Sequence, residues 1–193
     1  GAQLAGSPSE EYPALPGVGP WIGTLDSKEL CRCLAFVAHA VSTDDTRYNL
    51  QGVDVESESG RLLFVATDGH RLAMTGMPGE LAGIGVESKS AIWSRVDALR
   101  AALPQSDEVH VFREAGRVCF TSAYGSIYLR ETERQYPDFR KVLPKTDSRA
   151  LRLDRQEWIE KLEALVAMAP ERSHSIRFEL GASSLSMQTS NPD

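Results

Sequence analysis

The stretch FVATDGHRLAM, residues 64–74, joins an apolar run to the dipeptide Asp68-Gly69, with His70 and Arg71 directly after it. A run of this kind predicts a buried strand. Asp-Gly after a strand predicts a tight turn, because glycine can take positive φ and the aspartate side chain can cap the turn. The segment therefore predicts a strand that ends in a turn.

A catalytic or metal-binding role for Asp68 or His70 is the alternative interpretation of the same residues. Such a site needs further convergent groups, and the remaining histidines, at 39, 110 and 174, belong to no recognisable motif. The sequence contains no GxSxG, HExxH, P-loop or GxGxxG pattern. We therefore expect no enzyme, no metal site and no cofactor.

Further strands lie on both sides of this segment. Residues 48–57 and 61–68 are extended runs around the sequence ESESG, which predicts a hairpin loop. Residues 108–114, 117–123 and 126–131 predict three more strands, joined by short turns that contain glycine. The strands therefore predict a largely antiparallel sheet.

Two helices are predicted to cover this sheet. Residues 26–41 place Leu30, Leu34, Val37 and Val41 on one stripe, with Asp26 or Ser27 as the N-cap. Residues 88–103 predict a second helix, and Pro104 follows its end; its apolar face contains Ile92, Val96, Leu99 and Leu103. Two helices on an antiparallel sheet predict the α+β class.

Composition and charge limit the classes of function. The chain has 193 residues, of which 41% are hydrophobic and 25% charged, as in a globular protein. Its formal net charge of −6 argues against a stand-alone nucleic-acid binder, which usually has a basic surface. No run approaches the roughly 18 apolar residues that span a bilayer. Three cysteines without a metal or disulfide pattern indicate a reducing cytoplasm.

Short similar segments recur at a spacing of 123 to 128 residues. LDSKEL at 25–30 matches LDRQEW at 153–158, and both are predicted to begin a helix. The Tyr-Pro pair of EEYPALP recurs in RQYPDF, and VATDG at 65–69 aligns loosely with QTSNP at 188–192. Three matches in the same order predict the tail of one repeat, one whole repeat and the head of a third.

The outer faces of the helices differ in charge. Lys28, Arg32 and His39 share one side of the first helix, opposite its apolar stripe. Lys89 and Arg100 share a side of the second predicted helix, whereas residues 155–169 expose Glu157, Glu160 and Glu163. The basic face on the first helix is either an ordinary solvated surface or a surface that meets DNA.

The segments TRYNLQGVDVE, VATDGHRLAM and YPDFRKVLPK resemble the middle domain of the bacterial DNA polymerase III beta subunit, the sliding clamp. The resemblance covers nearly the whole chain. It implies a clamp fold of repeated domains, with the tail of the first at 1–15, a complete middle domain at 16–144 and the start of the third at 145–193. Because two of the three domains are partial, we expect no closed ring from this chain.

In function, the resemblance implies a processivity factor of DNA replication and not an enzyme. Clamps of this family close as head-to-tail homodimers around duplex DNA. They bind short motifs of the polymerase III catalytic subunit, the clamp loader, and repair and translesion polymerases, and they have no membrane partner. The alternative is a truncated adaptor that binds peptides without encircling DNA.

The resemblance also implies site residues by matching position. Those of the peptide pocket are Leu50, Thr67, Gly69, His70, Arg71, Leu72, Pro137, Lys141 and Val142. Those that face DNA are Lys28, Arg32, Arg47, Tyr48 and Lys89. Lys141 departs from the family, which often has arginine there, and this weakens any planar contact at the pocket rim. Asp44 and Asn49 also depart from the DNA-contacting residues of relatives.

Overall fold

The computed structural model describes Pro8 and residues 17–84, 91–104, 107–114, 116–132, 135–144, 151–169, 176–181 and 184–189. The chain divides into two compact units, Gly1–Asp138 and Phe139–Asp193, and each is described by itself. Of the predicted domains, residues 1–15 lie outside the described residues apart from Pro8. The boundary predicted after residue 144 stays a prediction.

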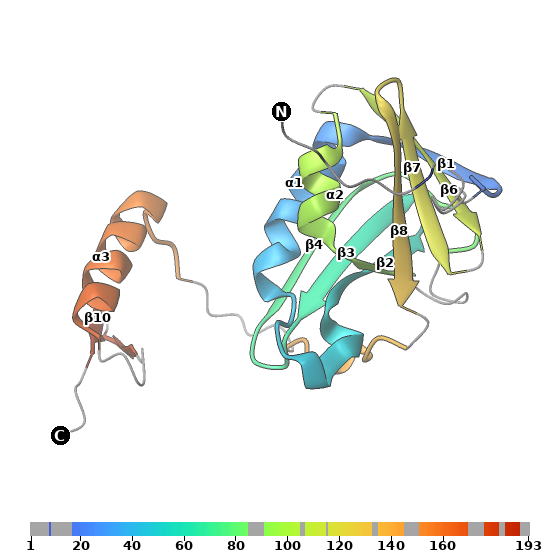
Figure 1. Ribbon diagram of the computed structural model, residues 1–193. Helices are drawn as coiled ribbons and strands as arrows, with labels where there is room; N and C mark the ends of the chain where they lie inside the picture. The colour runs from blue at the N-terminus through green and yellow to red at the C-terminus, as the bar shows by residue number, and fades with distance from the viewer. Residues whose placement is uncertain are drawn as a thin grey trace, which may run out of the picture. The chain divides into compact units, whose positions relative to one another are not determined.

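The first unit is built on one antiparallel sheet, which runs in the order β1-β6-β7-β8-β5-β2-β3-β4 (Figure 1). The strands are β1 (Trp21–Asp26), β2 (Gly52–Glu58), β3 (Arg61–Thr67), β4 (Leu72–Pro78), β5 (Ala91–Ser94), β6 (Glu108–Glu114), β7 (Arg117–Ser122) and β8 (Gly125–Thr132). Together with the helices this confirms the α+β class. The three strands predicted between residues 108 and 131 are also confirmed, as β6, β7 and β8.

The opening segment forms the end of β3, a turn and the start of β4. Thr67 and Leu72 pair across the turn, and Phe64, Val65 and Ala66 before it are fully buried. The predicted strand-ending turn is therefore confirmed. Upstream, β2 and β3 form the predicted hairpin, but its turn is only Ser59-Gly60, because residues 56–58 of the ESESG segment belong to β2 and pair with β3.

The extended run predicted from residue 48 is wrong at its start. Asp45–Leu50 forms the 3-10 segment η3, and the strand begins only at Gly52. The Asp44 side chain accepts a hydrogen bond from the Thr46 amide at 2.8 Å. Capping of this kind stabilises a helical turn over an extended backbone.

The first predicted helix is confirmed as α1 (Ser27–Val37), with Asp26 as its N-cap. Leu30, Leu34 and Val37 are fully buried, as the stripe predicts. The helix ends earlier than predicted, because the chain tightens into a 3-10 turn, η2 (Ala38–Ala40), and Val41 has extended geometry.

The second predicted helix, residues 88–103, is largely wrong. Residues 91–94 form β5, between β8 and β2, and only Val96–Ala102 forms the helix α2. Trp93 is fully buried and makes edge-to-face contacts with Phe64 on β3 and Phe120 on β7, each two strands away from β5 in the sheet. Arg95 has φ +54°, which separates the strand from the helix. Burial of the Trp93 ring therefore overrides the helical pattern that includes Ile92.

The core of the first unit lies between the sheet and its helices. α1 packs on β4, β3 and β1 and lies beside α2, which packs on β8 (Figure 1). The main apolar cluster combines α1 and α2 residues with residues of the strands. This packing fixes the end of β3, and with it the position of the turn.

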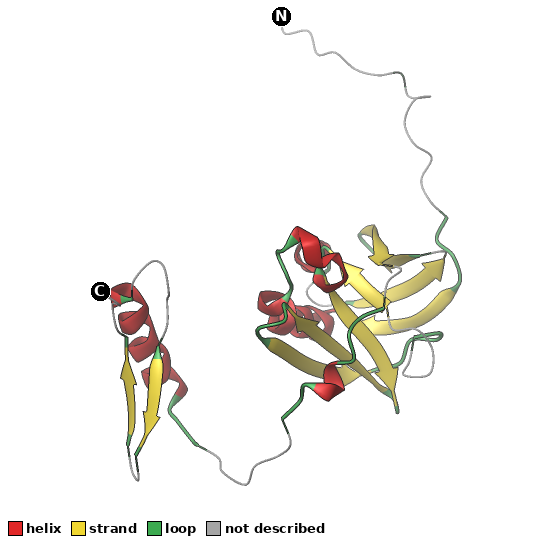
Figure 2. Ribbon diagram, turned by 90° about the horizontal axis from the view of Figure 1, so that it is seen from below, coloured by secondary structure: helices red, strands yellow, loops and turns green. Residues whose placement is uncertain are grey.

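The second unit contains a 3-10 turn, η4 (Phe139–Lys141), the helix α3 (Arg155–Met168) and the hairpin β9 (Arg177–Leu180) with β10 (Leu185–Gln188) (Figure 2). Trp158 of α3 stacks on Phe178 of β9 with ring centroids 5.5 Å apart. Asp154 caps α3 as Asp26 caps α1, which confirms that both LDxxE segments begin a helix. The match of 65–69 to 188–192 falls partly outside the described residues.

Candidate functional site

The carboxylate of Asp68 organises the turn between β3 and β4. Its Oδ1 accepts hydrogen bonds from the His70 amide at 2.9 Å and the Arg71 amide at 3.0 Å. Its Oδ2 pairs with Arg71 Nε at 3.0 Å. The amides of Arg71 and His70, which favour the charged form, lower the pKa of Asp68 to about 2. A general base that works near neutral pH needs a much higher pKa, so this carboxylate is suited to structure.

Thr67 closes the base of the turn. Its Oγ1 donates to the Arg71 carbonyl at 2.7 Å and accepts from the Gly69 amide at 3.1 Å. Its own amide donates to the hydroxyl of Tyr136 at 2.8 Å. Tyr136 is buried, and burial raises the pKa of its hydroxyl, which therefore stays neutral as a hydrogen-bond acceptor.

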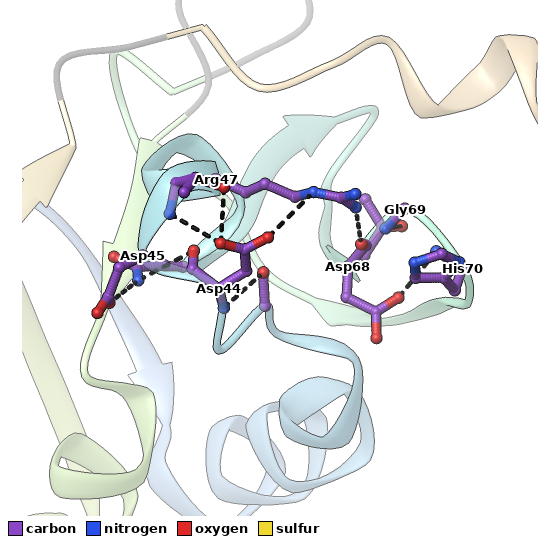
Figure 3. Close-up of polar contacts among 10 residues, drawn as sticks. Asp44, Asp45, Arg47, Asp68, Gly69 and His70 are labelled. Atoms are coloured by element: carbon purple, nitrogen blue, oxygen red, sulfur yellow. Dashed lines mark hydrogen bonds and ion pairs between the residues drawn. The ribbon is translucent and has the colours of Figure 1, made fainter. Parts of the chain in front are cut away.

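Arg47 reaches the same turn from η3 (Figure 3). Its Nη1 donates to the Asp68 carbonyl at 2.7 Å, and its Nε lies 3.5 Å from Oδ2 of Asp44. Gly69 has φ +87°, and a Cβ there would lie 2.6 Å from Arg47 Nη1. The positive φ therefore favours glycine at this position, and a side chain there would displace the Arg47 guanidinium from its present place.

The loop before β2 is itself held by Asp44 and its neighbours. Asp44 accepts from the Thr46 amide and hydroxyl, and Gln51 Nε2 donates to Asp45 Oδ1 at 2.9 Å. Figure 3 shows Asp44, Arg47 and Asp68 in one line of contacts. The loop and the turn thus form one connected polar network.

The structure brings together most of the predicted pocket residues. Thr67, Gly69, His70, Arg71 and Leu72 form or flank the turn; His70 and Arg71 are exposed, and Leu72 is half-buried. Pro137 is exposed and follows Tyr136, which bonds to Thr67.

The other pocket residues fit the prediction less directly. Leu50 ends η3 and is only 7% exposed, so it offers little surface to a ligand. Lys141 and Val142 belong to the second unit, where both are exposed. Their place in a common pocket stays a prediction.

The residues predicted to face DNA have different surroundings. Lys28 and Arg32 are exposed on α1, but Arg32 Nε pairs with Glu29 at 2.8 Å. Tyr48 is 45% exposed in η3, and Arg47 is held by the turn. Lys89 lies outside the described residues.

Tyr136 and Asp44, which support the turn and Arg47, were not predicted from the sequence as site residues. Tyr136 stands in the YPDF segment, but only its tertiary contact shows that its hydroxyl supports Thr67. Asp44 was noted only as a departure from relatives, although the pattern Asp-x-Thr before a polar turn signals a cap.

The described residues contain no group of three or more His, Cys, Asp and Glu side chains arranged to hold a metal ion. No helix in the same part of the chain has the length and apolar composition to cross a membrane.

Comparison with known proteins points to one family. Residues 24–92 match the family model of the DNA polymerase III beta subunit, central domain. The beta sliding clamp of Synechococcus elongatus is 30% identical over 187 residues, which are 92% of this chain and 49% of that protein. The beta sliding clamp of Pseudomonas putida is 28% identical, with 98% of this chain and 52% of that protein covered. The chain thus spans about half the length of these relatives.

Solved structures agree with the sequence comparison. The crystal structure of the DNA polymerase III subunit beta from Pseudomonas aeruginosa matches with a TM-score of 0.87 and 26% identity, over 96% of this chain and 52% of that one. A structure of the same protein bound to griselimycin matches with a TM-score of 0.82. By sequence and by fold, the chain is therefore related to the bacterial beta sliding clamps, and residues 24–92 correspond to the central domain of that subunit.

Proposed function

We propose that this chain is part of a processivity clamp that encircles duplex DNA as a dimeric ring in the cytoplasm. The observation that carries the proposal is the match to beta sliding clamps over nearly the whole chain, in sequence and in fold. In this role the chain catalyses no reaction. The carboxylate of Asp68 is used by the turn, and the protein acts by binding.

We further propose that the turn Thr67–Leu72 is one wall of a groove that binds short peptide motifs. Its partners would be the polymerase III catalytic subunit, the clamp loader, and repair and translesion polymerases. The turn is rigidly held, so its half-buried Leu72 and exposed His70 and Arg71 are presented in fixed positions. Preorganised surfaces bind with less loss of conformational entropy.

Leu72 supplies the apolar anchor of this wall. Leu50 is nearly inaccessible and is therefore not proposed as an anchor. His70 and Arg71 would then set the polar rim, and buried anchors usually dominate the affinity of such sites.

The charge distribution is compatible with topological binding of DNA. A ring that encloses the duplex does not need strong phosphate affinity, and tight binding would hinder sliding. The net charge is −6, and the exposed Lys28 and Arg32 give α1 only a sparse basic face.

A clamp-like adaptor that binds peptides without encircling DNA is the second candidate. It is favoured by the ion pairing of two residues that were predicted to face DNA, since Arg32 pairs with Glu29 and Arg47 with Asp44. Retention of the full-length natural protein on nicked circular duplex, with release when the circle is cut, would support the ring. Absence of retention, with peptide binding intact, would support the adaptor.

Titration of a labelled peptide tests the groove. A fluorescein-labelled peptide that contains Gln-Leu-Ala-Leu-Phe should bind the 193-residue chain, and a peptide with alanine in place of both leucines and the phenylalanine should not. Leu72→Asp should abolish binding, because it sets an unpaired charge against apolar side chains. His70→Ala should weaken binding only modestly, since water can replace a rim contact.

Trp21→Asp is the matched control for Leu72→Asp. Trp21 is 60% exposed on β1, at the opposite edge of the sheet from β4. The Trp21→Asp substitution should leave the affinity for the peptide unchanged. Undiminished binding by a folded Leu72→Asp variant, checked by circular dichroism, would show that the groove is elsewhere.

A further inference from the structure

The backbone of the turn between β3 and β4 is almost completely paired. The amides of Gly69, His70 and Arg71 are bonded to Thr67 Oγ1 or Asp68 Oδ1, within the turn itself. The Asp68 amide faces the Arg71 carbonyl at 3.4 Å. These contacts are local and any Thr-Asp-Gly turn of this shape could make them.

Two further contacts come from distant parts of the chain and hold consecutive residues. The Thr67 amide donates to the Tyr136 hydroxyl, 69 residues away, at 2.8 Å. The Asp68 carbonyl accepts from Arg47 Nη1, 21 residues away, at 2.7 Å. The first side chain is buried and the second is partly exposed. The turn is therefore fixed from two sides by groups that have no part in its own local geometry.

Arg47 makes polar contacts with two acidic residues at once, the side chain of Asp44 and the backbone carbonyl of Asp68. Its Nε is 3.5 Å from Asp44 Oδ2, and Asp44 is in turn fixed by Thr46. Nη1 lies where a side chain on Gly69 would have to go, so the arginine and the glycine occupy one packed position. This places the guanidinium against the turn, and its charge is shared between a carboxylate and a carbonyl.

We propose that Arg47 and Tyr136 are positioning residues of the peptide groove, which brace the backbone at Thr67 and Asp68 from two separate segments of the first unit, η3 and the segment after β8. This proposal rests on the groove function proposed above. The brace acts through the turn: it holds the wall that carries His70, Arg71 and Leu72 in the geometry that a peptide meets. Loss of either hydrogen bond, from Tyr136 or from Arg47, should make the turn Thr67–Leu72 more mobile, although all of its own residues are still present.

Two substitutions separate the brace from the general stability of the fold. Tyr136→Phe removes one oxygen atom, keeps the ring and leaves the Thr67 amide without its acceptor; Tyr124→Phe, on an 80% exposed tyrosine, is its matched control. Arg47→Gln removes the donor to Asp68, and Arg61→Gln, at the other end of β3, controls for the lost charge. Arg47→Lys is the rescue, because an ammonium can still donate one bond to a carbonyl.

Amide hydrogen exchange on the 193-residue chain tests the brace without any peptide. We expect faster exchange at Thr67 in Tyr136→Phe, and at Gly69, His70 and Arg71 in Arg47→Gln, with the amides of β6 and β7 unchanged. Both controls should exchange as the wild type does, and Arg47→Lys should restore most of the protection. Unchanged exchange at residues 67–71 in both folded variants would overturn the proposal.

Titration of the Gln-Leu-Ala-Leu-Phe peptide against the same variants tests the role in binding. Loss of one hydrogen bond that positions the wall should weaken affinity about 3- to 10-fold. The controls should bind as tightly as the wild type, and Arg47→Lys should recover most of the affinity. Faster exchange with unchanged affinity would overturn the positioning role, while the groove itself would stand. If the wild type binds no peptide, the groove fails and the brace has no function there, whatever the exchange shows.

Discussion

In α1 and α3 the same local chemistry begins the helix. Asp26 accepts a hydrogen bond from the Glu29 amide at 2.7 Å, and Asp154 accepts one from the Glu157 amide at 2.9 Å. Their surroundings differ, because α1 has six buried residues and α3 has none. The LDxxE motif thus determines where a helix begins, and the packing around the helix decides how much the helix contributes to stability.

Between α1 and α3, the largest difference in stability loss on mutation is expected at the matched leucines Leu34 and Leu162, which are 128 residues apart. Leu34 is fully buried, so Leu34→Ala should lower the free energy of unfolding by about 2–5 kcal/mol. Leu162 is only half-buried, and Leu162→Ala should cost less than about 1 kcal/mol. Urea unfolding followed by circular dichroism measures both. Equal losses would mean that α3 is packed in solution as α1 is.

The two N-caps should be equivalent where the two leucines are not. Asp26→Ala and Asp154→Ala each remove one capping acceptor, and each should destabilise its own helix by about 1 kcal/mol. Urea unfolding of the two variants, followed by helical circular dichroism, gives the comparison. Asp26→Asn and Asp154→Asn, which keep a capping oxygen, are the controls and should lose much less. A large difference between the two alanine variants would show that the caps depend on packing.

The Asp68 turn is a third local motif that can be compared with the two caps. The ionised Asp68 carboxylate should contribute less to stability than either cap, and its contribution should depend on pH. The folded pKa of about 2 lies below the ordinary value of 3.8, so the stabilisation is complete above about pH 4 and is lost as the pH falls toward 2. Titration of the carboxyl carbon by NMR should give a midpoint near 2. Arg71→Gln should raise that midpoint only slightly, because the backbone amides are the main cause. A midpoint near 3.8 in the wild type would show that the turn does not hold its bonds in solution.

The smallest expected effect is binding to linear DNA. The outer face of α1 carries Lys28 and Arg32, and the matched positions of α3 are Gln156 and Glu160, so neither helix is strongly basic. At physiological salt the 193-residue chain should show no measurable affinity for linear duplex in fluorescence anisotropy. Lys28→Glu should therefore change nothing under these conditions. A salt-sensitive dissociation constant in the micromolar range would contradict this interpretation of the charge pattern.

Five of the eight strands of the first unit, β2, β3, β6, β7 and β8, and the starts of both capped helices could be predicted from the sequence, because their signals are local. The strand that ends at Thr67, the ESESG hairpin and the Asp26 cap all depend on residues within a few positions of one another. The turn that contains Thr67, Gly69, His70, Arg71 and Leu72 also has a local signal, whereas the role of these residues in a peptide pocket was implied by the resemblance and stays a prediction.

The wrong predictions have two different causes, a distant contact for residues 91–94 and the local Asp44 cap for residues 48–50. Residues 91–94 were predicted as helix because Ile92 continues the helical spacing of the apolar residues after it. They form a strand instead, because Trp93 packs between Phe64 and Phe120. Residues 48–50 have the composition of a strand and are held in η3. The helical or extended preference of a few residues is worth at most about 1 kcal/mol, and burial of a large ring exceeds it.

By itself, the sequence determined the α+β class, the resemblance to the sliding clamps, the turn at Asp68-Gly69 and the start of both capped helices, since each follows from neighbouring residues or from a recognisable string. Only the tertiary structure decided that β5 is a strand, that Leu50 is nearly inaccessible, and that Arg47 and Tyr136 meet the turn at Asp68 and Thr67. These outcomes depend on groups that are 21 to 69 residues apart in the chain, and no local pattern records which of them the folded backbone brings within hydrogen-bonding distance.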